Sequence, residues 1–188
     1  IPESDPNHSG GVWTITPGSV LPTISAPVTI NGASQPGATP SAATFPNPVD
    51  SSLAIEVSGV STGTHVLALD SGASGSTVRG LALVDMVGGI YIVDSSNNTV
   101  VGNHLGVSAS GSVVKGGTNG VFVFGTSSGN RIGGPAAADR NLFAGNTYAA
   151  VAITDPTTIG TVVQGNDFGF TSGGGHVPPV AAFGIVLW

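Results

Sequence analysis

Short apolar segments recur along the whole chain and alternate with stretches of Gly, Ser, Asn and Asp. Segments such as "LAIEV", "HVLALD", "GIYIVD" and "GVFVFG" hold four to eight residues bounded by turn-forming residues, which is typical of β-strands. No window of ten or more positions places apolar residues at the helical spacing, and the many glycines disfavour helix. The pattern therefore predicts an all-β protein.

The segments return in a fixed order. "GIYIVDSSNNTVVGN" is followed by the related "GVFVFGTSSGNRIGG" and "AVAITDPTTIGTVVQGN". Equivalent apolar residues are spaced 31, 30 and 34 residues apart, from Ile90 to Val121, Val151 and Ile185. A drifting period of this size, filled with short strands and no helix, favours a solenoid of parallel strands over propeller blades or helical repeats. We expect about four to five coils.

The N-terminal section differs from the repeats. Nine of the 13 prolines lie before residue 49, and proline cannot donate to a strand ladder. We interpret residues 1–64 as irregular strands and loops, a candidate cap, and residues 65–188 as the coils of one continuous domain. The final "FGIVLW" resembles the first strand of a further coil. We therefore expect a fragment of a longer protein, or an end that packs against another chain.

The segments "LPTISAPVTINGASQPGA", "STVRGLAL", "NNTVVGNHLGV", "GNRIGGPAAADRNLFAGN" and "TVVQGNDFGF" resemble the bacterial right-handed parallel β-helix repeat proteins, which are pectate-lyase-like in fold. The resemblance covers roughly residues 11–188. It implies a right-handed parallel β-helix in a modular protein that is extracellular or at the bacterial cell surface. Because the family includes enzymes, adhesins and proteins without an assigned role, the resemblance leaves the activity open.

Stacked coils give the repeated asparagines a structural role. Aligning "VRGLAL", "VGNHLG", "DRNLFA" and "QGNDFG" places Leu81, Asn103, Asn141 and Asn166 in one column. Neighbouring strands lie about 4.8 Å apart, so stacked amides can hydrogen-bond in series and satisfy one another. We predict a structural ladder of Asn103, Asn141 and Asn166. Ligand binding by these amides is the less favoured alternative.

Apolar residues form further columns in this alignment. The predicted columns are Leu83, Leu105, Phe143 and Phe168; Val66, Ile90, Val121, Val151 and Ile185; and Val100, Ile132 and Val162. His104 aligns with Ala82, Leu142 and Asp167 in an outward column. The other histidines lack metal-ligand spacing.

Carboxylates end three of the strand segments. Asp70, Asp94 and Asp155, with Gly125 between them in the third repeat, are expected at one corner of successive coils. Asp70 and Asp94 would then lie about 5 Å apart, where a carboxylate pair could perform acid–base chemistry on a sugar or hold Ca²⁺. Aspartates at such corners more commonly bond to backbone N–H groups of turns. Asp70 and Asp94 are thus weak catalytic and metal-binding candidates, and calcium is the one cofactor considered.

Basic catalytic residues are scarce. A lyase needs a base beside its acidic site, and Arg79 is the one basic residue in a regular early coil. Arg79 aligns with Val101, and we expect it to face solvent or to pair with Asp85. The glycoside hydrolases of this fold carry clustered aspartates, Gly-His-Gly and Arg-x-Lys, and this sequence contains none of these motifs.

Composition narrows the function further. Only 7% of residues are charged, against about 25% in typical proteins, and the net charge is −6 with four basic residues. This excludes nucleic-acid binding by phosphate neutralisation. No apolar run reaches the ~18 residues of a membrane span, and the chain has no cysteine for disulfides or thiolate metal sites.

The sequence therefore favours a non-enzymatic extracellular module, structural or adhesive, of a larger surface or secreted protein. The outer positions are rich in Ser, Thr, Asn and Gly, which suits carbohydrate binding, with a polysaccharide as the expected partner. The other expected interaction is self-association through the open C-terminal coil. The alternative is a fragment of a polysaccharide-active lyase or glycoside hydrolase.

Overall fold

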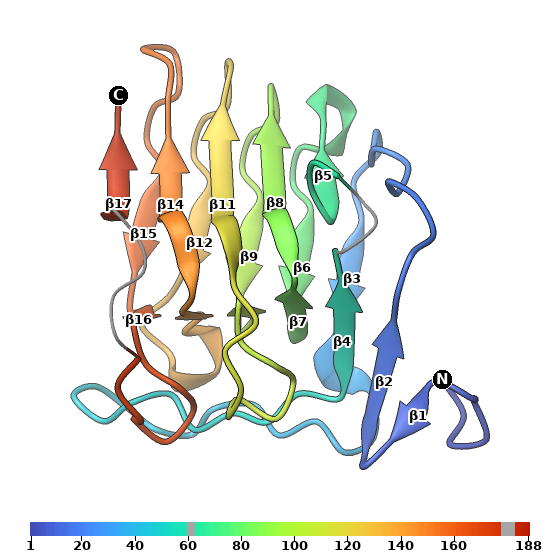
Figure 1. Cartoon of the computed structure of the whole chain (residues 1–188). Coiled ribbons are helices and arrows are strands. Elements are labelled where there is room, and N and C mark those ends of the chain that lie inside the picture. The colour runs from blue at the N-terminus through green and yellow to red at the C-terminus, as the bar shows by residue number, and fades with distance from the viewer. Residues whose placement is uncertain (60–62, 178–182) are drawn as a thin grey trace.

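The computed structural model describes residues 1–59, 63–177 and 183–188. Their regular structure consists of short strands in three sheets and three single-turn 3₁₀ helices, so the all-β prediction is confirmed (Figure 1). The 3₁₀ helices are η1 (Gly32–Ser34), η2 (Ser71–Ala73) and η3 (Ala137–Asp139).

The three sheets are here named A, B and C. Sheet A has the strand order β1 (His8–Ser9), β2 (Val12–Ile15), β4 (Ile55–Ser58), β7 (Leu81–Val84), β10 (His104–Leu105), β13 (Leu142–Phe143) and β16 (Asp167–Phe168). Sheet B has the order β17 (Phe183–Leu187), β14 (Asn146–Ile153), β11 (Gly117–Phe124), β8 (Met86–Val93) and β5 (Leu67–Leu69). Sheet C has the order β15 (Val162–Gln164), β12 (Arg131–Gly133), β9 (Thr99–Val101), β6 (Thr77–Arg79) and β3 (Thr29–Asn31).

Equivalent strands of consecutive repeats lie side by side. From β7 onward the chain enters sheets A, B and C in turn, and each strand pairs in parallel with the strand three positions later (Figure 1). Among the described strands only β1 and β2 pair antiparallel. The N-terminal section also contributes to this arrangement, because β3 pairs with β6 and β4 pairs with β7.

The residue registers reproduce most of the predicted columns. In sheet A, Leu105 pairs with Leu83 and with Phe143, and Phe143 pairs with Phe168. The rings of these two phenylalanines stack with centroids 5.2 Å apart. In sheet B, Val121 lies between its partners in the neighbouring repeats as the repeat spacing predicts.

Two predicted column members are wrong by one residue. Leu67, and not Val66, pairs with Ile90, because β5 aligns the buried Leu69 with Ile92. Val163, and not Val162, pairs with Ile132. Since side chains alternate between the faces of a strand, this single shift leaves the Val162 side chain 49% exposed.

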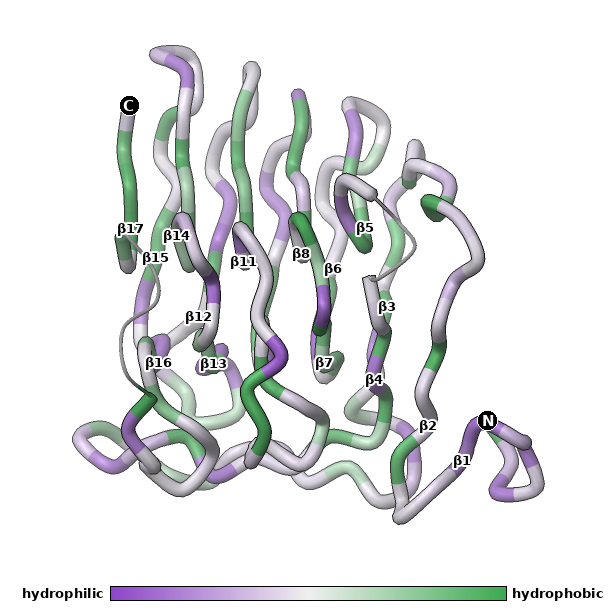
Figure 2. The backbone as a smooth tube through the Cα atoms, viewed as in Figure 1, coloured by the Kyte–Doolittle hydropathy of each residue, from purple (hydrophilic) through white to green (hydrophobic). Residues whose placement is uncertain are grey.

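A single large core cluster contains residues from all three sheets, including Ile90 of sheet B, Ile132 of sheet C and Phe143 of sheet A. Hydrophobic residues are prominent along β8, β11, β14 and β17, and they also occur in the connections along the base of the molecule (Figure 2). Burying each large aliphatic side chain contributes roughly 1.5–3 kcal/mol to stability.

Residues 39–53, here called the strap, leave the sheets and lie against the outer side of sheet A. Figure 1 shows this segment in cyan along the base of the molecule. Thr39 and Ser52 pair antiparallel at its two ends. Val49 packs in a buried cluster with Leu142, and Leu53 in another with Ala82. The strap therefore covers an outer face that would otherwise meet solvent.

Two hairpin loops hydrogen-bond to the strap. They follow β10 and β16 in equivalent places and are closed by the antiparallel bridges Val107–Val114 and Phe170–His176. The Leu53 N–H donates to the carbonyl of Ala109 in the first loop at 2.7 Å. The Gly173 N–H of the second loop donates to the carbonyl of Val49 at 2.8 Å.

The described ranges contain no helix long and apolar enough to cross a membrane.

Candidate functional site

The three predicted asparagines form a continuous hydrogen-bonded series. Asn103 Nδ2 donates to Asn141 Oδ1 at 3.2 Å, and Asn141 Nδ2 donates to Asn166 Oδ1 at 2.9 Å. Each Oδ1 also accepts the backbone N–H of the preceding repeat, as Asn103 Oδ1 does from Leu81 at 3.0 Å. The remaining amide hydrogens go to backbone carbonyls, such as that of Val78 for Asn103. These bonds engage the amides in joining one repeat to the next.

A second asparagine series lies at the turn that precedes sheet C. Asn98 Nδ2 and the Asn98 backbone N–H both donate to Asn130 Oδ1, at 3.0 and 2.9 Å. Asn98 Oδ1 accepts from the Ser76 N–H at 2.9 Å. Sequence reasoning missed this series, although "SSNN" and "SSGN" share the spacing Ser-Ser-x-Asn and could have revealed it.

The candidate aspartates are engaged with turn backbone. Asp94 and Asp155 adopt positive φ angles of 50° and 74°, and Gly125 has 74° at the equivalent place. Asp94 Oδ1 accepts the backbone N–H of Thr126 at 2.8 Å and its hydroxyl at 3.0 Å, and these bonds hold the pKa of Asp94 below its usual value. Asp155 Oδ2 accepts the Gly125 N–H at 2.8 Å.

Asp70 caps η2. Its Oδ1 accepts the Ser71 N–H at 2.7 Å, and its backbone has an ordinary φ of −101°. Asp70 therefore differs in conformation from Asp94, with which it was aligned. Within the described ranges, no group of three or more His, Asp or Glu side chains could hold a metal ion.

Arg79 is half-buried in sheet C, where it pairs with Asn31 and with Val101. The suggested ion pair with Asp85 is not among the ion pairs of the described residues. Asp85 instead donates its backbone N–H to the carbonyl of Lys115 at 2.9 Å.

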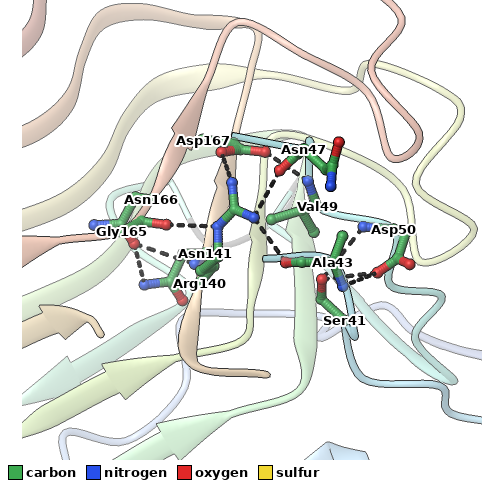
Figure 3. A network of polar contacts seen from close by, with 10 residues as sticks. All are labelled: Ser41, Ala43, Asn47, Val49, Asp50, Arg140, Asn141, Gly165, Asn166 and Asp167. Carbon is green, nitrogen blue, oxygen red and sulfur yellow. Dashed lines mark hydrogen bonds and ion pairs between the residues drawn. The ribbon is translucent and has the colours of Figure 1, made fainter. Parts of the chain in front are cut away.

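An extensive polar network joins Arg140 to the strap (Figure 3). The guanidinium is buried: Nε donates to the carbonyl of Gly165 at 2.9 Å, and Nη1 donates to the carbonyls of Ala43 and Asn47, both at 2.8 Å. Nη2 forms an ion pair with Asp167. This buried cation therefore binds two strap carbonyls directly.

Asp167 completes the attachment of the strap. Its second oxygen, Oδ2, accepts the Val49 N–H at 2.6 Å. Within the strap, Asp50 Oδ1 accepts from the Ser41 hydroxyl at 2.8 Å and from the Ala43 N–H at 3.2 Å, and these bonds lower the pKa of Asp50 (Figure 3). The Asp167 carboxylate thus binds the strap from sheet A, and the Asp50 carboxylate binds it from within the strap.

His104 lies beneath the strap. It pairs with Ala82 and Leu142 on the outer side of sheet A, as the alignment predicts, but its side chain is fully buried instead of facing solvent. Nε2 lies 2.8 Å from the Ser51 hydroxyl of the strap, and Nδ1 lies 2.9 Å from the carbonyl of Ser108. Burial lowers the pKa of His104 to about 4. A neutral ring with Nδ1–H donating satisfies both contacts.

Glu56, on the outer side of β4, is a further buried charge. Glu56 Oε1 accepts from Lys115 Nζ at 2.7 Å, and Oε2 accepts the Ala109 N–H at 2.9 Å. The bond to Glu56 raises the pKa of Lys115. This pair fastens the first hairpin loop to the stack.

Aromatic side chains gather on the outer face of sheet B. Tyr91 and Phe122 pair across β8 and β11, with ring centroids 5.4 Å apart. The ring centroid of Phe124 lies 4.8 Å from that of Phe122, and the ring centroid of His65 lies 5.1 Å from that of Tyr91. Partial burial raises the pKa of Tyr91 and lowers that of His65. These four rings are here called the aromatic patch, and they are only partly buried.

Comparison of the chain with protein-family models, with curated proteins and with solved structures found no match.

Proposed function

We propose that the chain is a non-enzymatic structural module with a right-handed parallel β-helix fold, belonging to an extracellular or cell-surface protein. The parallel pairing of every third strand and the passage of the chain through sheets A, B and C in turn support this fold. The sequence resemblance supports the handedness and the location.

One observation carries the structural role. The asparagines and aspartates that the sequence offers for chemistry hydrogen-bond to neighbouring repeats or to turn backbone, as the series from Asn103 through Asn141 to Asn166 does. Arg140 has hydrogen-bond acceptors at Nε and at both terminal nitrogens within the chain. Polar groups saturated in this way stabilise a stack and are not poised toward a substrate.

A polysaccharide-degradation assay separates this role from the enzymatic alternative. The protein is incubated with acidic and neutral polysaccharides, with and without Ca²⁺, and unsaturated and reducing ends are measured. We expect no release above a heat-treated sample. Release that disappears in Asp94→Asn would overturn the structural assignment in favour of a lyase or hydrolase.

The aromatic patch favours adhesion to polysaccharide as a second function. Partly exposed rings such as Tyr91 and Phe122 offer apolar faces, and the Tyr hydroxyl adds a polar edge. We expect glycan-array binding that Phe122→Ala weakens. Phe45→Ala is the matched control, because Phe45 is 86% exposed and belongs to the strap instead of sheet B. An array without signal would restrict the module to a scaffold.

A further inference from the structure

One outward column of sheet A alternates titratable and apolar residues beneath the strap. In the order of the parallel register, its members are Thr14, Glu56, Ala82, His104, Leu142 and Asp167. Among the described residues, the buried titratable side chains are Glu56 and His104 of this column and the neighbouring Arg140. The Asp167 side chain is only 12% exposed. Buried ionisable groups are therefore concentrated at one outer face.

The apolar members of the column pack against the strap. Leu142 lies in a buried cluster with Val49, and Ala82 lies in another with Leu53. The strap residues all lie in the described ranges, and none belongs to a strand of the three sheets. Detaching the strap would therefore uncover these apolar side chains without breaking a strand pairing.

The carboxylates of the column hold their cover by accepting hydrogen bonds. Asp167 Oδ2 accepts the Val49 N–H at 2.6 Å, and Glu56 Oε2 accepts the N–H of Ala109 in the first hairpin loop at 2.9 Å. The other oxygen of each carboxylate is engaged by a cation. A proton on either carboxyl group takes away one of these two acceptors. Acid therefore weakens both attachments.

His104 also holds the strap as an acceptor. With Nδ1–H donating to the Ser108 carbonyl, Nε2 accepts the hydrogen of the Ser51 hydroxyl across 2.8 Å. Protonation converts Nε2 into a donor and places a charge in a fully buried site. The histidine contact thus fails in the same direction as the carboxylate contacts.

The charged neighbours of the column reinforce this direction. They are Arg140 and Lys115 paired with the carboxylates, Asp85 near Lys115, Arg79 in a small cavity lined also by Ser41 and Ser51, Asp50 of the strap, and the exposed His176 of the second hairpin loop. The arginines and the lysine keep their charge in acid, whereas the carboxylates lose theirs. The site beneath the strap therefore becomes increasingly positive as the pH falls.

The buried bonds between repeats lack this sensitivity. They use asparagine amides, as between Asn103 and Asn141 and between Asn98 and Asn130, and the core columns are apolar. Neither kind of side chain takes up a proton in moderate acid. Acid therefore acts on the strap more strongly than on the stack.

We propose that the strap is an acid-released cover, which leaves the outer face of sheet A in acid while the three sheets remain paired. The open form presents Ala82 and Leu142 beside a charged His104, a surface that the closed form hides. Because the pKa of His104 is about 4 under the strap and about 6.5 when exposed, its contribution to closure is complete above pH 6.5 and is lost toward pH 4. His104 alone should raise the opening equilibrium constant up to about 300-fold over this range.

Methyl NMR of the 188-residue chain at decreasing pH tests the proposal. Val49 and Leu53 report on the strap, and Val121 and Ile132 report on the stack. We expect the strap methyl signals to move to the positions of a disordered chain at a pH where the stack signals are still native. Strap signals that do not change before the stack signals would overturn the proposal.

Variants establish which groups release the strap. His104→Gln keeps a donor and an acceptor without titrating, so release should require a lower pH. Ser51→Ala removes the hydroxyl that His104 binds, and release should then occur at a higher pH. This second variant decides the question if His104→Gln does not fold. A release pH that Ser51→Ala leaves unchanged would overturn the role of His104.

Asp167→Asn should also release the strap at a higher pH. Asp155→Asn is its matched control, because Asp155 likewise accepts a backbone N–H, that of Gly125, but at a turn between sheets B and C. Equal shifts in the release pH for the two variants would contradict the proposal. Glycan binding and degradation do not enter these readouts, so failure here is distinguishable from failure of the proposed function.

Discussion

Arg140 and Asp167, 27 residues apart in the sequence, form a buried ion pair whose two members both hold the strap. Arg140 binds the carbonyls of Ala43 and Asn47, and Asp167 accepts the N–H of Val49. The pair therefore joins two neighbouring repeats to a segment that lies more than 90 residues earlier.

Removing Arg140 should destabilise the protein strongly. Arg140→Ala leaves the Asp167 carboxylate largely buried without its cation and two strap carbonyls without a donor, so we expect a loss of about 3–5 kcal/mol in urea unfolding. Arg131→Ala is the control: its pair with Asp139 is half-exposed and should be worth less than about 1 kcal/mol. The double variant Arg140→Met/Asp167→Leu should lose less than Arg140→Ala. Equal losses for Arg140→Ala and Arg131→Ala would contradict the anchoring role.

His104 should make stability fall with acid. Its pKa is about 4 in the folded protein and about 6.5 when unfolded, so the unfolded state binds the proton more readily. This contribution is complete above pH 6.5 and is lost as the pH falls toward 4, by up to about 3 kcal/mol. Denaturation at several pH values, comparing the native protein with His104→Leu, measures it. The exposed His176 serves as control. If His176→Ala removed the same dependence of the free energy of unfolding on pH, its assignment to His104 would be wrong.

The asparagine series should be most sensitive at its centre. Asn141→Ala deprives both the backbone N–H and the side-chain amide of Asn103 of their acceptor, which should cost about 2–4 kcal/mol. Asn166→Ala should destabilise the protein less, because Asn166 is the last member of the series and is only half-buried. Asn97→Gly should be neutral within about 0.5 kcal/mol, since the exposed Asn97 has a φ of 58° that glycine adopts freely. Thermal melts that rank these three variants otherwise would count against the series.

A charge placed on either side of sheet C should distinguish the core face from the outer face. Ile132→Asp puts a carboxylate into the core and should abolish cooperative unfolding. Val163→Asp should destabilise through the same face, whereas Val162→Asp on the exposed face should fold with a nearly unchanged melting temperature. A destabilised Val162→Asp together with a tolerated Val163→Asp would restore the original alignment.

The repeat spacing was enough to predict the columns, and ambiguity appeared where two apolar residues are adjacent. In Val66–Leu67 and Val162–Val163 either residue suits the core, so hydrophobicity alone cannot choose the register. The pattern also predicted that His104 lies on the outer side of its strand, but not that another segment covers it.

The strap could not be predicted, for a physical reason. Its hydrogen bonds to the repeats and hairpin loops join residues separated by 53 positions, as in Ser51 and His104, to 124 positions, as in Val49 and Gly173. Within the strap itself, Ser41 and Asp50 have the local pattern of ordinary loop residues. No periodicity in the sequence marks a segment whose partners are spread over several repeats.

The separation of these contacts has a consequence for folding kinetics. The strap is synthesised early, but its anchors Arg140, Asp167 and Gly173 leave the ribosome only after most of the repeats. Until then Val49 has an incomplete burial site, because Leu142 and Ala144 of its cluster also come late in the chain, and loop-closure entropy opposes its docking. Strap docking should therefore be a late step, and the interval before it is the time in which the nascent chain is most exposed to aggregation.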